Sequence, residues 1–192
     1  MELAGTHAGT NKRLGMKLFI LSDSLTFAAI LSGYCYLRLS SSVWPHPFAL
    51  SNIGYAIGMS LCLFASSLTM MRAVSAMRRG DQTAMRRWAG LTILGGTAFL
   101  VMHLSEWRRL MAEGIVPSAM PLGSGSQAFA STFFGITGLH MLHVLSGIVL
   151  LALLIFRKRA TTTDVEISGF YWQFVDAVWV FVFALVYLPS IS

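Results

Sequence analysis

Two histidines three residues apart, His140 and His143, lie inside the longest apolar stretch of the chain, "STFFGITGLHMLHVLSG" (131–147). Imidazole rings ligate metals, exchange protons near neutral pH and hydrogen-bond between helices, so three kinds of chemistry are open to this pair. An ionisable group in hydrocarbon is costly unless it is paired. Each such residue in an apolar stretch therefore needs a partner or a function.

Four further ionisable side chains lie in apolar stretches: Asp23, His103, Glu106 and Asp176. Because successive spans of a membrane protein run in opposite directions, depth sorts these residues. We expect His103 and Glu106 near the outer end of the third span, within reach of His140. Asp23 and Asp176 lie about two helical turns from the other surface, at similar depths.

The ligand pattern argues against a metal site. A haem needs one or two axial imidazoles, and a copper or non-haem iron site needs several converging ligands. The chain has no HxxxH pair, no third histidine at matching depth and no carboxylate cluster. We therefore predict no metal ligands in this chain, and histidines that hydrogen-bond to Glu106, to the backbone or to a lipid headgroup.

The elements that position these residues are membrane spans. Of the 192 residues, 55% are hydrophobic and 11% charged, whereas soluble domains carry about 25% charged residues. The net charge of +6 comes from basic residues at the ends of apolar runs, which excludes nucleic acid as a partner. The pattern predicts an all-α bundle: a polar tail (1–13), then one domain (14–192) with spans at about 16–38, 50–74, 88–110, 128–156 and 170–190.

The distribution of basic residues predicts the orientation of these spans. Eleven of the fourteen Lys and Arg residues fall on the side of the N-terminus. Because cytoplasmic loops carry the excess of Lys and Arg, we expect the N-terminus in the cytoplasm and the C-terminus outside. The two cysteines, Cys35 and Cys62, lie in apolar stretches without paired spacing, so no disulfide is expected.

The fifth span, "GFYWQFVDAVWVFVFALVYL", places a carboxylate on an aromatic stripe formed by Trp172, Asp176, Trp179, Phe183 and Tyr187. One interpretation is an aromatic packing face with interfacial anchors. The other is a seam with a second protein, in which Trp172, Asp176 and Trp179 make the subunit contact, since a carboxylate facing lipid is costly.

Four stretches in this order resemble subunit III of the heme–copper terminal oxidases: "FILSDSLTFAAILSGYCYLR", "LSEW", "STFFGITGLHMLHVLSG" and "VEISGFYWQFVDAVW". The resemblance extends over nearly everything after residue 14 and fits the five-helix bacterial form. This chain differs from many members of the family at two positions. It has Asp23 where they have glutamate, and Gln173 where histidine is usual.

The resemblance implies a non-catalytic subunit without haem or copper, in a bacterial inner-membrane complex that reduces oxygen and pumps protons. It implies docking on the haem–copper subunit I, with subunit II and a small subunit IV as further candidate partners. It also implies support of proton uptake, and phospholipid in a cleft between two helix groups, spans one and two against spans three to five. The residues assigned to this cleft are Asp23, His103, Glu106, His140 and His143.

Two rival functions remain: an accessory subunit of a nitric oxide reductase, and a small ion transporter using Asp23 and Asp176. The second is disfavoured because five helices allow no inverted repeat. The "VEISGFYW" context favours cytochrome c over quinol as the electron donor of the complex.

Overall fold

The computed structural model describes residues 2–42, 44, 50–116, 123–157 and 160–190, and the regular structure in this part of the chain is helical. α5 continues through a short π-helix, η1 (Phe183–Tyr187), into a 3₁₀ turn, η2 (Leu188–Ser190). Each long helix contains a segment long and apolar enough to cross a membrane, which confirms the predicted all-α fold with five spans. These helices are α1 (Glu2–Ser40), α2 (Leu50–Arg78), α3 (Gln82–Ala112), α4 (Gly123–Phe156) and α5 (Thr162–Val182).

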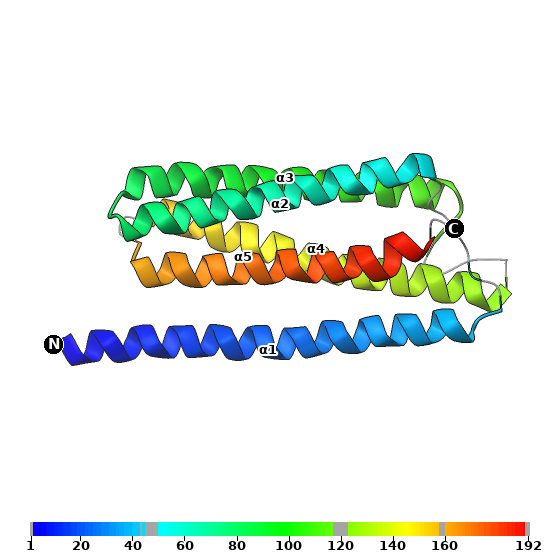
Figure 1. Ribbon diagram of the computed structural model, residues 1–192, viewed down its shortest axis with the longest axis horizontal. Helices are drawn as coiled ribbons and strands as arrows, with labels where there is room; N and C mark the ends of the chain where they lie inside the picture. Colours follow the sequence, from blue (N-terminus) through cyan, green and yellow to red (C-terminus); the bar gives the residue numbers. More distant parts are fainter. Residues whose placement is uncertain (1, 43, 45–49, 117–122, 158–159, 191–192) are drawn as a thin grey trace.

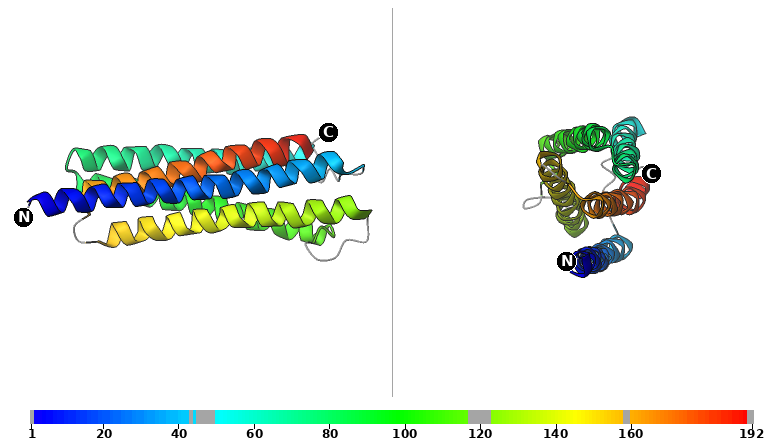
Figure 2. Two further views of the ribbon diagram at one scale, coloured as in Figure 1. Left: turned by 90° about the horizontal axis from the view of Figure 1, so that it is seen from below. Right: turned by 90° about the vertical axis from the view of Figure 1, so that its left-hand side faces the viewer.

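Helices α2 to α5 form a ring of four, each packed against the next, and α1 lies outside the ring against α4 and α5 (Figure 2). The N-terminus, the α2–α3 turn and the start of α5 lie at one end of the bundle, which we call the N-terminal end (Figure 1). The C-terminus lies at the other end. Ionisable residues can therefore lie either inside the ring or in the seam between the ring and α1.

This arrangement corrects the expected grouping of spans one and two against spans three to five. α2 packs on α3 and α5, whereas α1 packs on α4 and α5. The tight turn after Arg78 makes α2 and α3 antiparallel neighbours. Small residues then let the two backbones approach closely, since a Cβ added at Gly95 would lie 2.7 Å from the Cβ of Ser66.

Local sequence signals set the helix ends. Gly80 and Gly114, with φ of +79° and +87°, follow α2 and α3 in the left-handed conformation that glycine adopts without strain. Asp81 caps α3 by accepting a 2.8 Å hydrogen bond from the backbone N–H of Ala84. Thr161 and Asp164 form a reciprocal capping box at the start of α5.

The helices at the N-terminal end are longer than the predicted spans. The polar stretch expected as a tail continues α1 as helix from Glu2, and α5 begins at Thr162 rather than near 170. Ion pairs join these extensions, with Lys12 Nζ 2.9 Å from an oxygen of Asp164 and Arg13 Nη2 2.6 Å from one of Glu166. Lys158 and Arg159, which contribute to the basic bias, lie outside the described residues.

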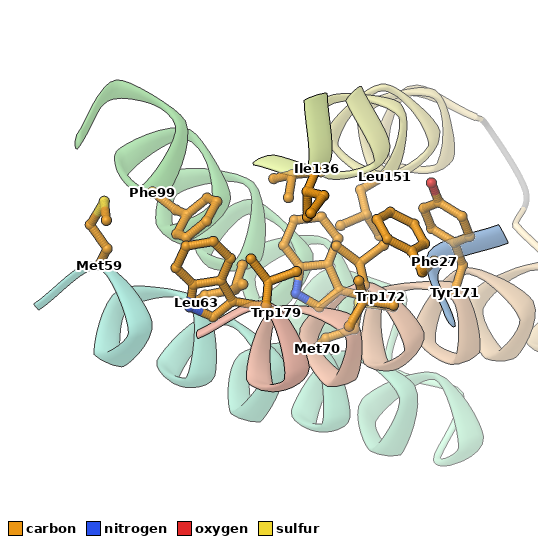
Figure 3. Close-up of a cluster of buried hydrophobic side chains, with 14 of the residues drawn as sticks. Phe27, Met59, Leu63, Met70, Phe99, Ile136, Leu151, Tyr171, Trp172 and Trp179 are labelled. Carbon is orange, nitrogen blue, oxygen red and sulfur yellow. The ribbon is translucent and has the colours of Figure 1, made fainter. Parts of the chain in front are cut away.

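The core of the ring is built around two tryptophans of α5 (Figure 3). Trp172 and Trp179 are fully buried. Glycines make room for the first: a Cβ added at Gly96 of α3 or Gly147 of α4 would lie 2.6 Å or 2.9 Å from the Trp172 ring. These close approaches fix the position of α5 between α3 and α4.

Candidate functional site

The structure divides the five residues that were expected to line one cleft into two groups. The first, the outer pair, lies between α1 and α4 outside the four-helix ring and consists of Asp23 and His143. The second group, His103, Glu106 and His140, lies inside the ring and packs with Trp179 and Tyr187. We call these five side chains the inner cluster.

The outer pair joins two helices through a single short contact. The Nε2 atom of His143 lies 2.8 Å from Oδ2 of Asp23, and the ring edge packs on Phe27 with centroids 5.2 Å apart. The hydroxyl of Tyr171 in α5 donates to the backbone carbonyl of His143 at 3.0 Å. Asp23 therefore has a titratable partner, which the sequence alone had not assigned to it.

Both ring nitrogens of His143 have a partner. Nδ1 lies 2.8 Å from the carbonyl oxygen of Leu139, and Nε2 faces the carboxyl group of Asp23. Because a carbonyl only accepts, a hydrogen bond to Leu139 is donated by Nδ1–H. The outer pair is thus a short contact between an imidazole and a carboxyl group that joins α4 to α1.

The outer pair is reachable from the membrane. The side chains of Asp23 and His143 are 21% and 15% exposed. About two turns closer to the N-terminal end, a groove of 700 Å³ runs between α1, α4 and α5. We call this the α1–α4 groove; its apolar walls include Met16 and Leu153, and Lys12 and Arg157 stand at its mouth.

The inner cluster, by contrast, is sealed from the membrane. His103 and His140 are fully buried and Glu106 is 2% exposed. Their assignment to a lipid cleft is therefore corrected, because the ring helices cover all three side chains. The depths estimated from the sequence did predict that these three residues lie close together. Both imidazole rings contact the indole ring of Trp179.

Trp179 is the centre of the inner cluster. The ring of His140 stacks on it at 5.2 Å between centroids, and that of His103 meets it edge-on at 5.5 Å. Phe99 completes the packing at 4.8 Å. The ring nitrogens of both histidines have no hydrogen-bond partner within the described residues, so these imidazoles pack as aromatic rings.

A carboxyl–phenol contact closes the inner cluster toward the C-terminal end. The hydroxyl of Tyr187 donates to Oε2 of Glu106 at 2.6 Å, and Nδ1 of His103 lies 3.9 Å from the same oxygen. Tyr187 belongs to the π-helix η1, whose turn holds more residues than an α-helical turn. The sequence placed Tyr187 on the aromatic stripe with Trp179, and the two rings do lie 5.6 Å apart between centroids. It did not predict the hydrogen bond to Glu106, because that bond depends on how α3 packs against α5.

No three His, Cys, Asp or Glu side chains converge as a metal ion requires in the part of the chain that is described.

The histidines of the inner cluster and of the outer pair face different surroundings although His140 and His143 are three residues apart. Chemically, the inner cluster offers aromatic packing and one strong hydrogen bond, while the outer pair offers proton exchange.

The two tryptophans predicted at a subunit contact pack within their own chain. The indole N–H of Trp172 donates to Ser66 Oγ at 3.1 Å, and that of Trp179 to Ser60 Oγ at 2.9 Å. Both side chains are 0% exposed, so no surface of either remains for a second protein. Asp176 is partly exposed, beside Ser67 on the α2 side of α5, and is the member of the trio that another subunit could contact.

The surface of the bundle defines the class of protein. Large apolar side chains such as Leu25, Leu94 and Leu153 leave 64–65% of their area exposed. Five membrane-length helices carry this surface. The inner cluster lies inside the ring and the outer pair lies in its seam with α1, while Asp176 is partly exposed on the α2 side of α5. The chain is therefore a multi-pass integral membrane protein whose chemistry lies between helices.

Comparison with known proteins identifies the family. The family model described as "Cytochrome c oxidase subunit III" matches residues 2–191. The chain therefore belongs to this family, the third subunit of heme–copper oxidase complexes. Cytochrome c oxidase subunit 3 of Alkalihalophilus pseudofirmus is 32% identical over 97% of this chain and 91% of its own length.

Two further relatives match over similar lengths. The probable cytochrome c oxidase subunit 3 of Mycobacterium bovis is 33% identical over 91% of this chain and 86% of its own. The cytochrome bo(3) ubiquinol oxidase subunit 3 of Pseudomonas putida is 30% identical over 93% of this chain and 86% of its own. Both cytochrome c and quinol oxidases thus have subunits similar to this chain.

Proposed function

We propose that this chain is a non-catalytic, cofactor-free subunit III of a bacterial respiratory oxidase that reduces oxygen to water and pumps protons. In this function the chain docks on the haem–copper subunit I, retains phospholipid and supports proton uptake. The proposal places it in the cytoplasmic membrane with its N-terminus inside, and cytochrome c is the electron donor that the sequence favours.

The observation that carries the proton role is the outer pair. Asp23 and His143 lie 2.8 Å apart and remain partly exposed beside an apolar surface. An imidazole and a carboxyl group can each take up a proton from an external donor or release one to an external acceptor, which makes the pair suited to exchange with a neighbouring protein surface. The inner cluster is sealed and takes no part in this exchange.

The lipid role belongs to the α1–α4 groove. It holds 700 Å³ and lies on the same seam as the outer pair. Lys12 and Arg157 at its mouth approach Asp164 at 2.9 Å and 3.2 Å, and apolar walls continue below them. A phospholipid in this groove would cover the approach to the outer pair, which links lipid retention to protection of the proton site.

Docking on another subunit is supported by Asp176. The residue is partly exposed inside a membrane-length segment, beside Ser67 of α2. A carboxylate facing lipid is unfavourable, so a second subunit that covers Asp176 would remove this cost.

Purification of the tagged chain in mild detergent tests the function as a whole. We expect a haem-bearing subunit I to copurify, cytochrome c to be oxidised faster than quinol, and the separated subunit to be colourless. A haem absorption band that stays with the isolated chain and disappears in His140→Ala would overturn the cofactor-free assignment. Copurification with a nitric-oxide-reducing complex would favour the rival function.

A further inference from the structure

The imidazole rings of His103 and His140 bring four nitrogen atoms into the interior of the four-helix ring. Both side chains are 0% exposed, and none of these nitrogens has a hydrogen-bond partner among the described residues. The rings pack against Phe99 and Trp179, but the indole N–H of Trp179 is donated to Ser60. Because a neutral imidazole carries one N–H donor and one acceptor nitrogen, aromatic packing leaves the polar edge of each ring unpaired.

Glu106, one turn along α3 from His103, adds an unpaired acceptor. Its Oε2 accepts from the Tyr187 hydroxyl at 2.6 Å, whereas Oε1 is buried and has no partner in the described part of the chain. Nδ1 of His103 lies 3.9 Å from Oε2, which is too far for a direct hydrogen bond. One water molecule that bonds to both atoms at about 2.8 Å spans this distance.

Arg109 adds unpaired donors one turn further toward the C-terminal end. Its Nε and Nη2 atoms are buried and have no hydrogen-bond partner within the described residues, and Nε lies 3.8 Å from Oε1 of Glu113. Its charge is close enough to act on both Glu106 and Tyr187. Since the side chain is 35% exposed, Arg109 extends from the inner cluster to the surface of the bundle.

Unpaired polar atoms are costly inside a membrane protein. The large majority of buried side-chain polar atoms bond to protein or to ordered water, and lipid offers no donor or acceptor in their place. A buried water bonds to about three otherwise unpaired groups. His103, His140 and Glu106 supply five such atoms, and within the described chain they do not converge as a metal ion requires. Water is therefore the ligand that these atoms fit.

We propose that the inner cluster is a buried water-binding site. Water bridges His103 to Glu106, bonds to the ring nitrogens of His140, and joins Oε1 of Glu106 to the guanidinium group of Arg109. The ring helices separate this site from lipid, and its polar atoms continue only toward the C-terminal end of the bundle. The inference concerns the inner cluster alone and does not depend on the proposed function.

Solid-state NMR of the full-length chain in deuterated lipid bilayers tests the proposal. With the histidine and tryptophan nitrogens labelled with ¹⁵N, we expect magnetisation from water to build up several-fold faster at His103 and His140 than at Trp172. The indole of Trp172 is the matched control, because it is equally buried but donates directly to Ser66 at 3.1 Å. Equal build-up at all three side chains would overturn the proposal.

A variant without ring nitrogens tests the same site through stability. His140→Phe keeps an aromatic ring against Trp179 but bonds to no water, so we expect the chain to unfold at a lower temperature. If the imidazole served only as an aromatic ring, removing two unpaired nitrogens would leave that temperature unchanged or raise it, which would contradict the proposal. Tyr36→Phe, at a side chain that is 72% exposed, is the control and should change nothing. The NMR measurement on the unmodified chain separates loss of water from altered packing.

Discussion

Among single residues, the contact between Asp23 and His143 has the clearest functional consequence. The carbonyl of Leu139 occupies Nδ1 of His143, so Nε2 is the ring nitrogen that faces Asp23. The side chain of Asp23, although short, reaches His143 across the seam at 2.8 Å.

Replacing Asp23 by asparagine tests the proposed proton exchange. Asp23→Asn can still donate to His143 through its amide, so helix packing and initial oxygen consumption should match wild type. Because the amide cannot ionise, we expect faster loss of activity during sustained turnover or a shift of the alkaline limb of the pH profile. The measurement is oxygen consumption over time at several pH values.

Asp81→Asn is the control for this experiment. It removes an exposed carboxylate at the cap of α3, where asparagine caps about as well as aspartate, and should leave both the time course and the pH profile unchanged. If Asp23→Asn behaves like Asp81→Asn, the outer pair only holds α1 against α4.

The Tyr187–Glu106 contact makes a prediction about stability. Tyr187→Phe leaves a buried carboxyl oxygen without its donor, which costs about 1–3 kcal/mol. We expect a lower thermal unfolding temperature of the complex-bound subunit, with the outer pair unaffected. A double-mutant cycle with Glu106→Gln isolates the pairwise contribution, and additive effects in that cycle would show that the hydrogen bond contributes nothing.

At the scale of elements, glycines rather than polar residues decide how α3, α4 and α5 fit together. The ring of Trp172 occupies the space that a side chain at Gly96 or Gly147 would need. Tyr187, which lies in the π-turn η1, meets Glu106 across the ring. Helix packing in lipid lacks a hydrophobic driving force, so such close approaches carry much of the association energy.

Gly147→Leu tests the packing of α4 against α5. Overpacking a filled core costs typically 1–3 kcal/mol, occasionally more, and we expect the subunit to unfold at a lower temperature and to leave the complex more readily. Gly90→Ala in α3 is the control, since an added Cβ there meets nothing within 4 Å. It should be neutral or slightly stabilising, because alanine is the better helix former. Equal melting temperatures for both variants would contradict the close packing of Trp172.

At the scale of the whole molecule, the charge asymmetry between the two ends predicts the orientation of the chain in the membrane. The N-terminal end carries the basic residues of α1, the α2–α3 turn and the ion pairs of Asp164 and Glu166. Basic residues at the other end are few, and one of them, Arg38, donates to the carbonyl of Pro189 at 2.6 Å. The bias therefore lies at one physical end of the bundle.

Cysteine labelling from each side of the membrane tests the orientation. With Cys35 and Cys62 replaced by alanine, Arg79→Cys should react only from the cytoplasmic side and Glu113→Cys only from outside. The reason is that eleven of the fourteen Lys and Arg residues fall on the side of the N-terminus. Labelling of position 79 from outside would reverse the topology.

The sequence by itself determined the number of spans, the class of protein and the family, because these depend on composition, apolar length and ordered motifs. It also indicated that His103, Glu106 and His140 share a depth, since depth follows from position along a span. These properties depend only on the order of residues along the chain and not on how the helices pack against one another.

Tertiary structure alone decided which faces of the helices meet. It placed His143 with Asp23, 120 residues away, and enclosed His140 within the ring. It also turned Trp172 and Trp179 inward and left α1 outside the ring rather than beside α2. In an apolar span nearly every face is hydrophobic, so the sequence does not distinguish a face that meets lipid from one that meets protein. The shape of each helix surface does distinguish these faces, because the large tryptophan rings fit only where glycines on the neighbouring helices leave room for them.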